Sequence, residues 1–276
     1  MSGPYEVLLL DLDGTLLDGR GEVRSRNCSA LCDLQERGVL VMLVTGRSTM
    51  GALPITDALG LSAPTVVFNG AAIYCPERRG LIEERVLSNA AMERAMEFSA
   101  ERDLLTLVMT RDRKLALEPR SDVERSALRG LEGLELVERA DLAVEYALRV
   151  SWLSAVHDDS GVLAAEVEGH IACPATYTHF PLHLIAEHRG SPLQACDMHA
   201  PCRGKAEALR FVEERYAIPP ERVAAVGDAT NDLAMFEAAG LAVCMGSGMP
   251  EALAAADRVI GDHDSDAIAE WIEETF

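Results

Sequence analysis

The apolar run EVLLL at residues 6–10, which stops at the acidic turn DLDGT, most constrains how this chain can fold. Two similar runs follow, VLVMLV at residues 39–44 and TVVF at residues 65–68. Between the first two lies an amphipathic segment at residues 24–37, and a second helical segment ends near residue 59. Continuously apolar strands that alternate with helices are typical of a parallel sheet covered on both faces. We therefore expect an α/β fold with a doubly wound parallel sheet.

The pattern of strands and helices changes near residue 85 and returns after residue 203. Between these points, helical stretches alternate with strand-like runs and turn signals, which indicates an inserted α/β domain at residues 84–196, with boundaries defined to ±8 residues. The core domain would then consist of residues 1–83 and 197–276. The predicted order along the chain is core, insert, core.

Composition excludes several classes of protein. With 49% hydrophobic residues the chain can bury a core, and its apolar runs are far shorter than the roughly 20 residues that cross a bilayer. The formal net charge of −20 repels nucleic-acid backbones, so neither nucleic acid nor membrane is an expected partner. The N-terminus has no basic segment typical of a signal peptide, and the seven cysteines form no CxxC pair. These features lead us to expect a cytoplasmic protein with reduced thiols.

Asp11 and Asp13 are the first candidates for chemistry, because they directly follow a buried strand. The carboxyl ends of parallel strands line the ligand crevice of an open sheet, so both carboxylates should project there. Asp11 could attack as a nucleophile, while Asp13 gives and takes a proton. Two nearby carboxylates repel each other and favour a bound cation. For a bare DxD pair, an ordinary acidic turn is the alternative interpretation.

In this context the string DLDGT resembles the first motif of the haloacid dehalogenase superfamily of phosphotransferases, and further motifs follow in the family's order. Thr45, followed by Gly46 and Arg47, lies where the family places a hydroxyl that binds the transferring phosphoryl group. Thr45 could instead cap the following helix. Lys205 occupies the place of the third motif, although Ala206 stands where the family often has glycine.

The string GDATND at residues 227–232 matches the fourth motif, GDxxND. The residues that the resemblance places around a magnesium ion are Asp11, Asp228 and, through its backbone carbonyl, Asp13. It further implies that Asp232 orients the metal shell or Lys205, and that Asn231 supports the nearby loop. Asp11 would then form an aspartyl-phosphate, while Asp13 protonates the leaving alcohol and later activates water.

The position of the insert, between the second motif and Lys205, resembles the C2-type cap of the Cof-like branch of this superfamily. Such a cap closes over the site and contacts the leaving group. The candidate substrate contacts, which are weaker than the motif residues, are Asn69, His183, His188 and Arg189.

The resemblance implies a Mg²⁺-dependent phosphatase that acts on a small phosphorylated metabolite such as a sugar or polyol phosphate. A phosphomutase needs the same motifs, and only analysis of the products separates the two. A protein that binds a phosphorylated metabolite without catalysis would be expected to lack a motif acid or the lysine. A hydrolytic dehalogenase is disfavoured, because that reaction has no use for Asp13 or for a metal.

Overall fold

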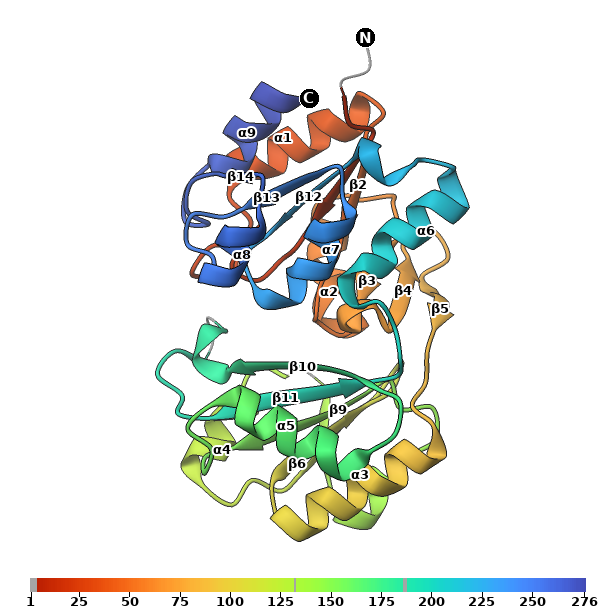
Figure 1. Ribbon diagram of the computed structural model, residues 1–276, viewed down its shortest axis with the longest axis vertical. Coiled ribbons are helices and arrows are strands. Elements are labelled where there is room, and N and C mark those ends of the chain that lie inside the picture. Colours follow the sequence, from red (N-terminus) through yellow and green to blue (C-terminus); the bar gives the residue numbers. More distant parts are fainter. Residues whose placement is uncertain (1–3, 132, 186–187) are drawn as a thin grey trace. The chain divides into compact units, whose positions relative to one another are not determined.

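The computed structural model describes residues 4–131, 133–185 and 188–276 (Figure 1). Its chain divides into two compact units. Unit 1 consists of Met1–Glu83 and Arg203–Phe276, and unit 2 of Glu84–Cys202. Strand β11 (Gln194–His199), which spans the boundary expected between residues 196 and 197, lies wholly in unit 2.

A parallel sheet with the strand order β14-β13-β12-β1-β2 forms the centre of unit 1. Its strands are β1 (Val7–Leu10), β2 (Leu40–Leu43), β12 (Val223–Gly227), β13 (Leu241–Cys244) and β14 (Arg258–Val259). In register, Val7 of β1 lies opposite Leu40 of β2 on one side and Val223 of β12 on the other. The carboxyl ends of three strands from distant parts of the sequence therefore lie next to one another. The predicted α/β fold with a parallel sheet is confirmed.

Helices cover both faces of this sheet, which explains why its strands are apolar throughout. Successive residues of β1 point to opposite faces, so that Leu8 and Leu10 join one hydrophobic core and Val7 and Leu9 join the other. Helices α1 and α9 pack on the first face, and α6, α7 and α8 on the second (Figure 1). The helices of unit 1 are α1 (Ser25–Glu36), α2 (Thr49–Ala58), α6 (Glu207–Tyr216), α7 (Leu233–Ala238), α8 (Pro250–Ala255) and α9 (Ala267–Thr275).

A small sheet of β3 (Thr65–Val67), β4 (Ala72–Cys75) and β5 (Gly80–Glu84) completes unit 1. Strands β3 and β4 form an antiparallel hairpin, and a single parallel bridge joins Val44, after β2, to Val66 of β3. The hairpin turns through the short 3₁₀ helix η1 (Phe68–Gly70). This turn lies beside the loop that follows β2.

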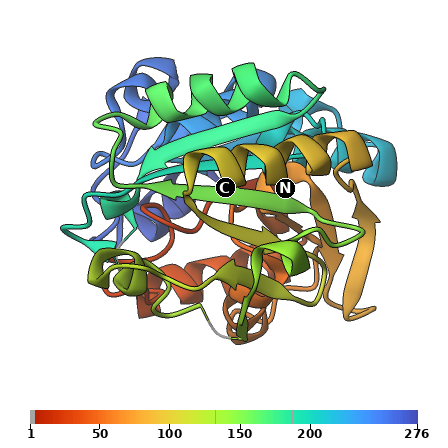
Figure 2. The ribbon, with the colours of Figure 1, turned by 90° about the horizontal axis from the view of Figure 1, so that it is seen from below.

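Unit 2 is a mostly antiparallel sheet with the strand order β10-β11-β9-β6-β7-β8. Its helices α3 and α5 lie side by side (Figure 2), and Phe98 of α3 packs edge-on against Trp152 of β9, with ring centroids 5.7 Å apart. The remaining bounds are α3 (Asn89–Arg102), β6 (Leu105–Met109), β7 (Lys114–Leu117), α4 (Asp122–Ala127), β8 (Leu134–Val137), β9 (Arg149–Ser154), α5 (Ser160–Ile171) and β10 (Thr176–Pro181).

Among the residues that the structure describes, no helix has both the length and the apolar character needed to cross a membrane. All seven cysteines are free thiols.

Candidate active site

The loops after β1, β2 and β12 carry most of the predicted site residues, and the register of the sheet brings these loops together. Asp11 directly follows β1, Thr45 follows β2, and Asp228 directly follows β12. Lys205 comes from the short 3₁₀ helix η5 (Gly204–Ala206), which leads into α6. All of these residues belong to unit 1.

The ammonium group of Lys205 is the centre of this arrangement. Its Nζ donates hydrogen bonds of 2.6 Å to Oδ1 of Asp11 and of 2.6 Å to Oδ1 of Asp232. The side chain is only 1% exposed, so burial alone would lower the pKa of the ammonium. The two carboxylates outweigh burial and raise the pKa of Lys205 above its usual range. Lys205 therefore stays charged and fixes one oxygen of Asp11.

Three acids gather around this lysine. Carboxylate oxygens of Asp11, Asp228 and Asp232 lie within 4.8 Å of one another. Burial, together with the neighbouring acids, raises the pKa of Asp11, and Lys205 only partly opposes this. Burial and the charge of Asp232 likewise raise the pKa of Asp228 to about 7. One ammonium therefore leaves negative charge in this cluster uncompensated.

This donor set fits a divalent cation that prefers oxygen ligands. Asp232 is already engaged: its Oδ1 accepts from Lys205, and its Oδ2 accepts from the backbone amides of Asp228 and Ala229, both at 3.0 Å. Asp11 gives Oδ1 to Lys205, and Asp228 gives Oδ1 to the hydroxyl of Thr15, so both carboxylates keep lone pairs that a cation can use. A cation bound by them would offset the charge that burial makes unfavourable.

Asp13 takes a different position from the other acids. Its carboxylate pairs with the guanidinium of Arg47, with Nε 2.8 Å from Oδ2 and Nη2 2.5 Å from Oδ1. This bidentate ion pair joins the loop after β1 to the loop after β2. The side chain of Asp13 remains 40% exposed. Arg47, predicted to contact the phosphate or to support the residues that do, is the partner of Asp13.

Thr45 is fully buried, and its hydroxyl oxygen accepts a 3.0 Å hydrogen bond from the backbone amide of Arg47. The alternative interpretation of Thr45 as a helix cap is wrong. Ser48 caps α2 instead, because its hydroxyl accepts from the backbone amide of Gly51 at 3.3 Å. Thr45 lies three residues before this cap, and because its oxygen accepts from Arg47, its hydroxyl hydrogen can be donated to another group.

Asn69 and Asn231 meet in unit 1, where Nδ2 of Asn231 donates to Oδ1 of Asn69 at 3.2 Å. Asn69, predicted as a substrate contact, is only 3% exposed. The other three predicted substrate contacts belong to unit 2. His183 lies in the 3₁₀ helix η3 (Leu182–Leu184), with His188 and Arg189 shortly after it.

The motif-based prediction gave Thr15 no role, but Thr15 contacts a proposed metal ligand. Its buried hydroxyl donates to Oδ1 of Asp228 at 2.9 Å. The preceding Gly14 has a φ of 76°, and a Cβ at this position would lie 2.4 Å from Oδ2 of Asp228. The last two letters of DLDGT therefore serve to hold Asp228 against the loop after β1. The sequence feature that could have pointed to Gly14 and Thr15 is that both belong to the motif DLDGT.

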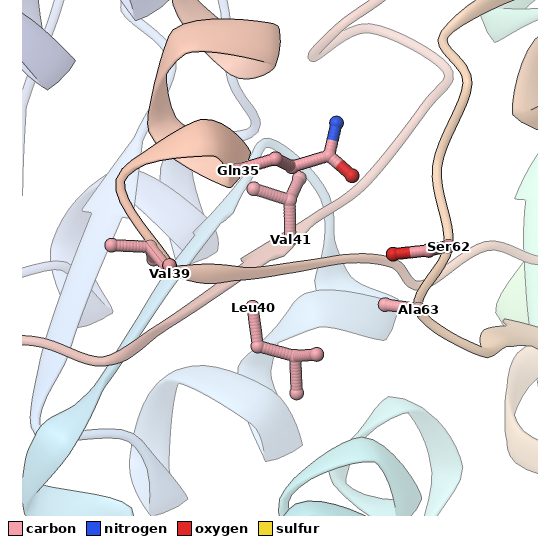
Figure 3. Close-up of a pocket in the computed structure, with 7 residues that line it drawn as sticks. Gln35, Val39, Leu40, Val41, Ser62 and Ala63 are labelled. Atoms are coloured by element: carbon pink, nitrogen blue, oxygen red, sulfur yellow. The ribbon is translucent and has the colours of Figure 1, made fainter.

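A cavity of about 210 Å³ in unit 1 lies elsewhere (Figure 3). Leu40 and Val41 line it from the beginning of β2, together with Gln35 and Ala63. Asp11 and Thr45 follow the opposite, carboxyl ends of their strands. This cavity has no ionisable lining residue and does not belong to the candidate site.

Comparison with known proteins gives consistent results. The sequence model of the haloacid dehalogenase-like hydrolase family matches residues 8–272. The chain is 29% identical to the pyridoxal phosphate phosphatase YbhA of Escherichia coli, over 96% of this chain and 97% of that protein. It is 23% identical to the 5-amino-6-(5-phospho-D-ribitylamino)uracil phosphatase YitU of Bacillus subtilis, over 99% and 98% of the two chains.

Among solved structures, a haloacid dehalogenase-like hydrolase from Bacteroides thetaiotaomicron is similar along the whole chain. Its TM-score is 0.79 at 25% sequence identity, and the match covers 99% of this chain and 100% of that one.

Proposed function

Because the chain belongs to the haloacid dehalogenase-like hydrolases, in their Cof-like branch, we propose that it is a phosphatase that hydrolyses the phosphate ester of a small metabolite. One observation carries the proposal: Lys205 holds a single oxygen of the buried Asp11 carboxylate, at 2.6 Å. The other oxygen is then oriented for attack, in a cluster with the charge to bind a cation.

Asp11 and Asp228 would hold the cation, for which we propose Mg²⁺, together with the backbone carbonyl of Asp13. When bound, Mg²⁺ neutralises negative charge on a phosphoryl group and orients it. The ammonium of Lys205 contributes a second positive charge from within the protein. These charges provide locally what a chain with a net charge of −20 lacks over its surface.

In the first proposed step, Oδ2 of Asp11 attacks phosphorus while Oδ1 stays bonded to Lys205. A phosphorus–oxygen bond forms, and the bond to the leaving alcohol breaks, which gives an aspartyl-phosphate. The hydroxyl of Thr45 accepts from the amide of Arg47, so its own hydrogen can be donated to a phosphoryl oxygen. The backbone thus orients Thr45 as a donor.

Asp13 is the proposed general acid and base. Its pair with Arg47 is one that an ionised carboxylate makes, so Asp13 must leave Arg47 before it can carry a proton to the leaving alcohol. In the second step, water attacks the phosphorus of the aspartyl-phosphate and gives its proton to Asp13. Inorganic phosphate leaves, and the Asp11 carboxylate is restored.

For the substrate we propose a sugar or polyol phosphate. The names of the two relatives specify different phosphate esters, and one of them contains a phosphorylated ribityl group. Both names support a small phosphorylated metabolite as the substrate class. The assignment of unit 2 as a C2-type cap, with His183, His188 and Arg189 as candidate contacts, is part of the same proposal.

Hydrolysis of a generic aryl phosphate tests the reaction. We expect release of inorganic phosphate with Mg²⁺, loss of activity on adding EDTA, and recovery with excess Mg²⁺. Asp11→Asn should keep the circular dichroism spectrum and lose activity by about 10³-fold or more. Activity that survives EDTA would contradict the metal site, and an active Asp11→Asn variant would contradict the nucleophile. If the protein is given a sugar phosphate and converts it into an isomer without releasing phosphate, it is a mutase.

A panel of sugar, polyol, nucleotide and cofactor phosphates, ranked by kcat/KM, then tests the substrate class. We expect the sugar and polyol phosphates to have the highest kcat/KM. A preference for nucleotides would contradict it.

A further inference from the structure

The turn η1 between β3 and β4 has a backbone conformation that residues other than glycine rarely adopt. The φ angles of Phe68, Asn69 and Gly70 are 52°, 50° and 95°. Positive φ is uncommon outside glycine, and for a bulky residue such as Phe68 it is an outlier. A conformation of this kind persists only where its surroundings impose it.

The loop after β2 imposes part of this conformation. The backbone amide of Phe68 donates to the carbonyl oxygen of Arg47 at 2.9 Å, and the amide of Asn69 donates to that of Thr45 at 3.0 Å. The amide of Thr45 in turn donates to the carbonyl of Val66 at 2.9 Å. The loop that carries Thr45 and Arg47 is thus joined to the turn by two backbone hydrogen bonds and to the preceding strand β3 by a third.

The same turn also contacts the loops that carry Lys205 and Asp228. A Cβ on Gly70 would lie 2.1 Å from the carbonyl oxygen of Gly204, the residue before Lys205. Oδ1 of Asn69 accepts from Asn231, which precedes the Asp232 that binds Lys205. One three-residue turn therefore touches three of the loops from which the proposed site is built.

The side chain of Asn69 is placed between two of these loops. A Cβ on Gly46 would lie 2.9 Å from Oδ1 of Asn69, so the amide group rests directly on the loop after β2. Its bond to Asn231 reaches the loop after β12, and only 3% of Asn69 is exposed. This placement suits a spacer between loops better than a contact with substrate.

We infer that Asn69 is a positioning residue, which fixes the loop bearing Thr45 to the loop bearing Asp228 and Asp232. This inference rests on the proposed function, and it replaces the expectation that Asn69 binds substrate. It acts through Asn231: without the amide of Asn69, the segment that holds the metal ligand Asp228 loses its link to Thr45. Small displacements of such groups cost catalysis far more than they cost binding.

Asn69→Gly is the informative variant, because glycine adopts positive φ readily and removes only the side chain. We expect the melting temperature of the metal-free protein to stay the same or rise. We expect kcat for an aryl phosphate to fall about tenfold or more, and KM to change by less than about twofold. Ala217→Gly is the matched control: Ala217 also has positive φ, at 55°, but it is exposed at the end of α6. It should keep the wild-type kcat.

A double-mutant cycle with Asn231→Ala tests the path through Asn231. The combined variant should lose no more kcat than the more damaged single variant. Losses that multiply would contradict the inference, as would a wild-type kcat in Asn69→Gly. A raised KM with an unchanged kcat would show that Asn69 contacts substrate after all.

A second measurement separates this inference from the proposed function. If the wild type releases no phosphate with Mg²⁺, the proposed function fails, but binding of Mg²⁺ alone can still be measured through the rise in melting temperature. Asn69→Gly should show a smaller rise at a given Mg²⁺ concentration than the wild type and Ala217→Gly. An equal rise in all three proteins would overturn the positioning role.

Discussion

The buried ammonium of Lys205 allows three acids to share one site. Asp11 and Asp232 each give it an oxygen at 2.6 Å, and neither acid has more than 6% of its side chain exposed. Taking charges out of water is costly, and only short pairing with an opposite charge makes it tolerable. Lys205 therefore contributes to the folded state as well as to the proposed reaction.

Lys205→Met should destabilise the metal-free protein by about 3–5 kcal/mol, because it leaves two buried carboxylates without their partner. Urea unfolding followed by circular dichroism measures the loss. Arg258→Met is the control, since it removes an ion pair with Glu274 in which both side chains are largely exposed, and such pairs contribute about 0–1 kcal/mol. Equal losses in the two variants would show that the buried pair is no stronger than a surface pair.

We expect His199 to make the stability of unit 2 depend on pH. Neither of its ring nitrogens has a hydrogen-bond partner among the described residues, and burial lowers its pKa to about 3, with Arg149 adding to this and Asp197 opposing it. As pH falls below about 6.5, the unfolded chain binds a proton that the folded chain does not. The free energy of unfolding should therefore fall by up to about 1.4 kcal/mol per pH unit from this residue alone.

Urea unfolding between pH 7 and pH 5 checks this expectation. The His199→Gln variant should lose stability less steeply than the wild type as pH falls, and His183→Gln, at an exposed position, is the matched control. Parallel curves for wild type and His199→Gln would mean that His199 is not held neutral.

The turn after β1 needs glycine for two separate reasons. Gly14 has a φ of 76°, and its Cα lies so close to Asp228 that a Cβ would come within 2.4 Å of a carboxylate oxygen. Gly38, after α1, has a φ of 87° with nothing within 4 Å of such a Cβ. The two positions therefore share the backbone requirement and differ in what a methyl group would meet.

Gly14→Ala should lose activity and Gly38→Ala should keep it, although both lose stability through unfavourable φ, by about 1 kcal/mol. We expect the Gly14 variant to displace Asp228 and so to need more Mg²⁺ for half-maximal phosphatase activity. Melting curves and Mg²⁺ titrations of the two variants give the comparison. An unchanged Mg²⁺ requirement in Gly14→Ala would mean that Asp228 moves without consequence.

The parallel sheet and the motif residues could be predicted because both depend on local sequence. Apolar runs that end in DLDGT or GDATND mark strands and the loops at their carboxyl ends. The pair between Asp13 and Arg47, and the bond from Asn231 to Asn69, could not be predicted. They depend on which strands become neighbours and on a positive φ at Asn69, and neither leaves a pattern in the residues nearby.

Among the described residues, each buried hydrophobic cluster draws its members from one unit. The buried cluster around Phe98 and Trp152 draws only on unit 2. The two clusters on the faces of the parallel sheet draw on both segments of unit 1, such as Leu10 from the first and Val226 from the second. Unit 2 is continuous in sequence, whereas unit 1 needs both of its segments.

A fragment of residues 84–202 should therefore fold by itself, and a fragment of residues 1–83 should not. Thermal unfolding followed by circular dichroism should show a cooperative transition for the first fragment and none for the second. Mixing residues 1–83 with residues 203–276 is the control for unit 1, because it supplies β12 to β1. Absence of a transition in the fragment of unit 2 would show that its core depends on unit 1.

Strand β1 lies between β2 and β12 in the finished sheet, but a ribosome makes β12 only after the whole of unit 2. During synthesis, one edge of β1 and the apolar side chains around it have no partner, while unit 2 can already be complete. Unpaired apolar strands of this kind are prone to aggregate and are what chaperones bind. The strand that leads to Asp11 therefore keeps one edge unpaired until the whole of unit 2 has been synthesised.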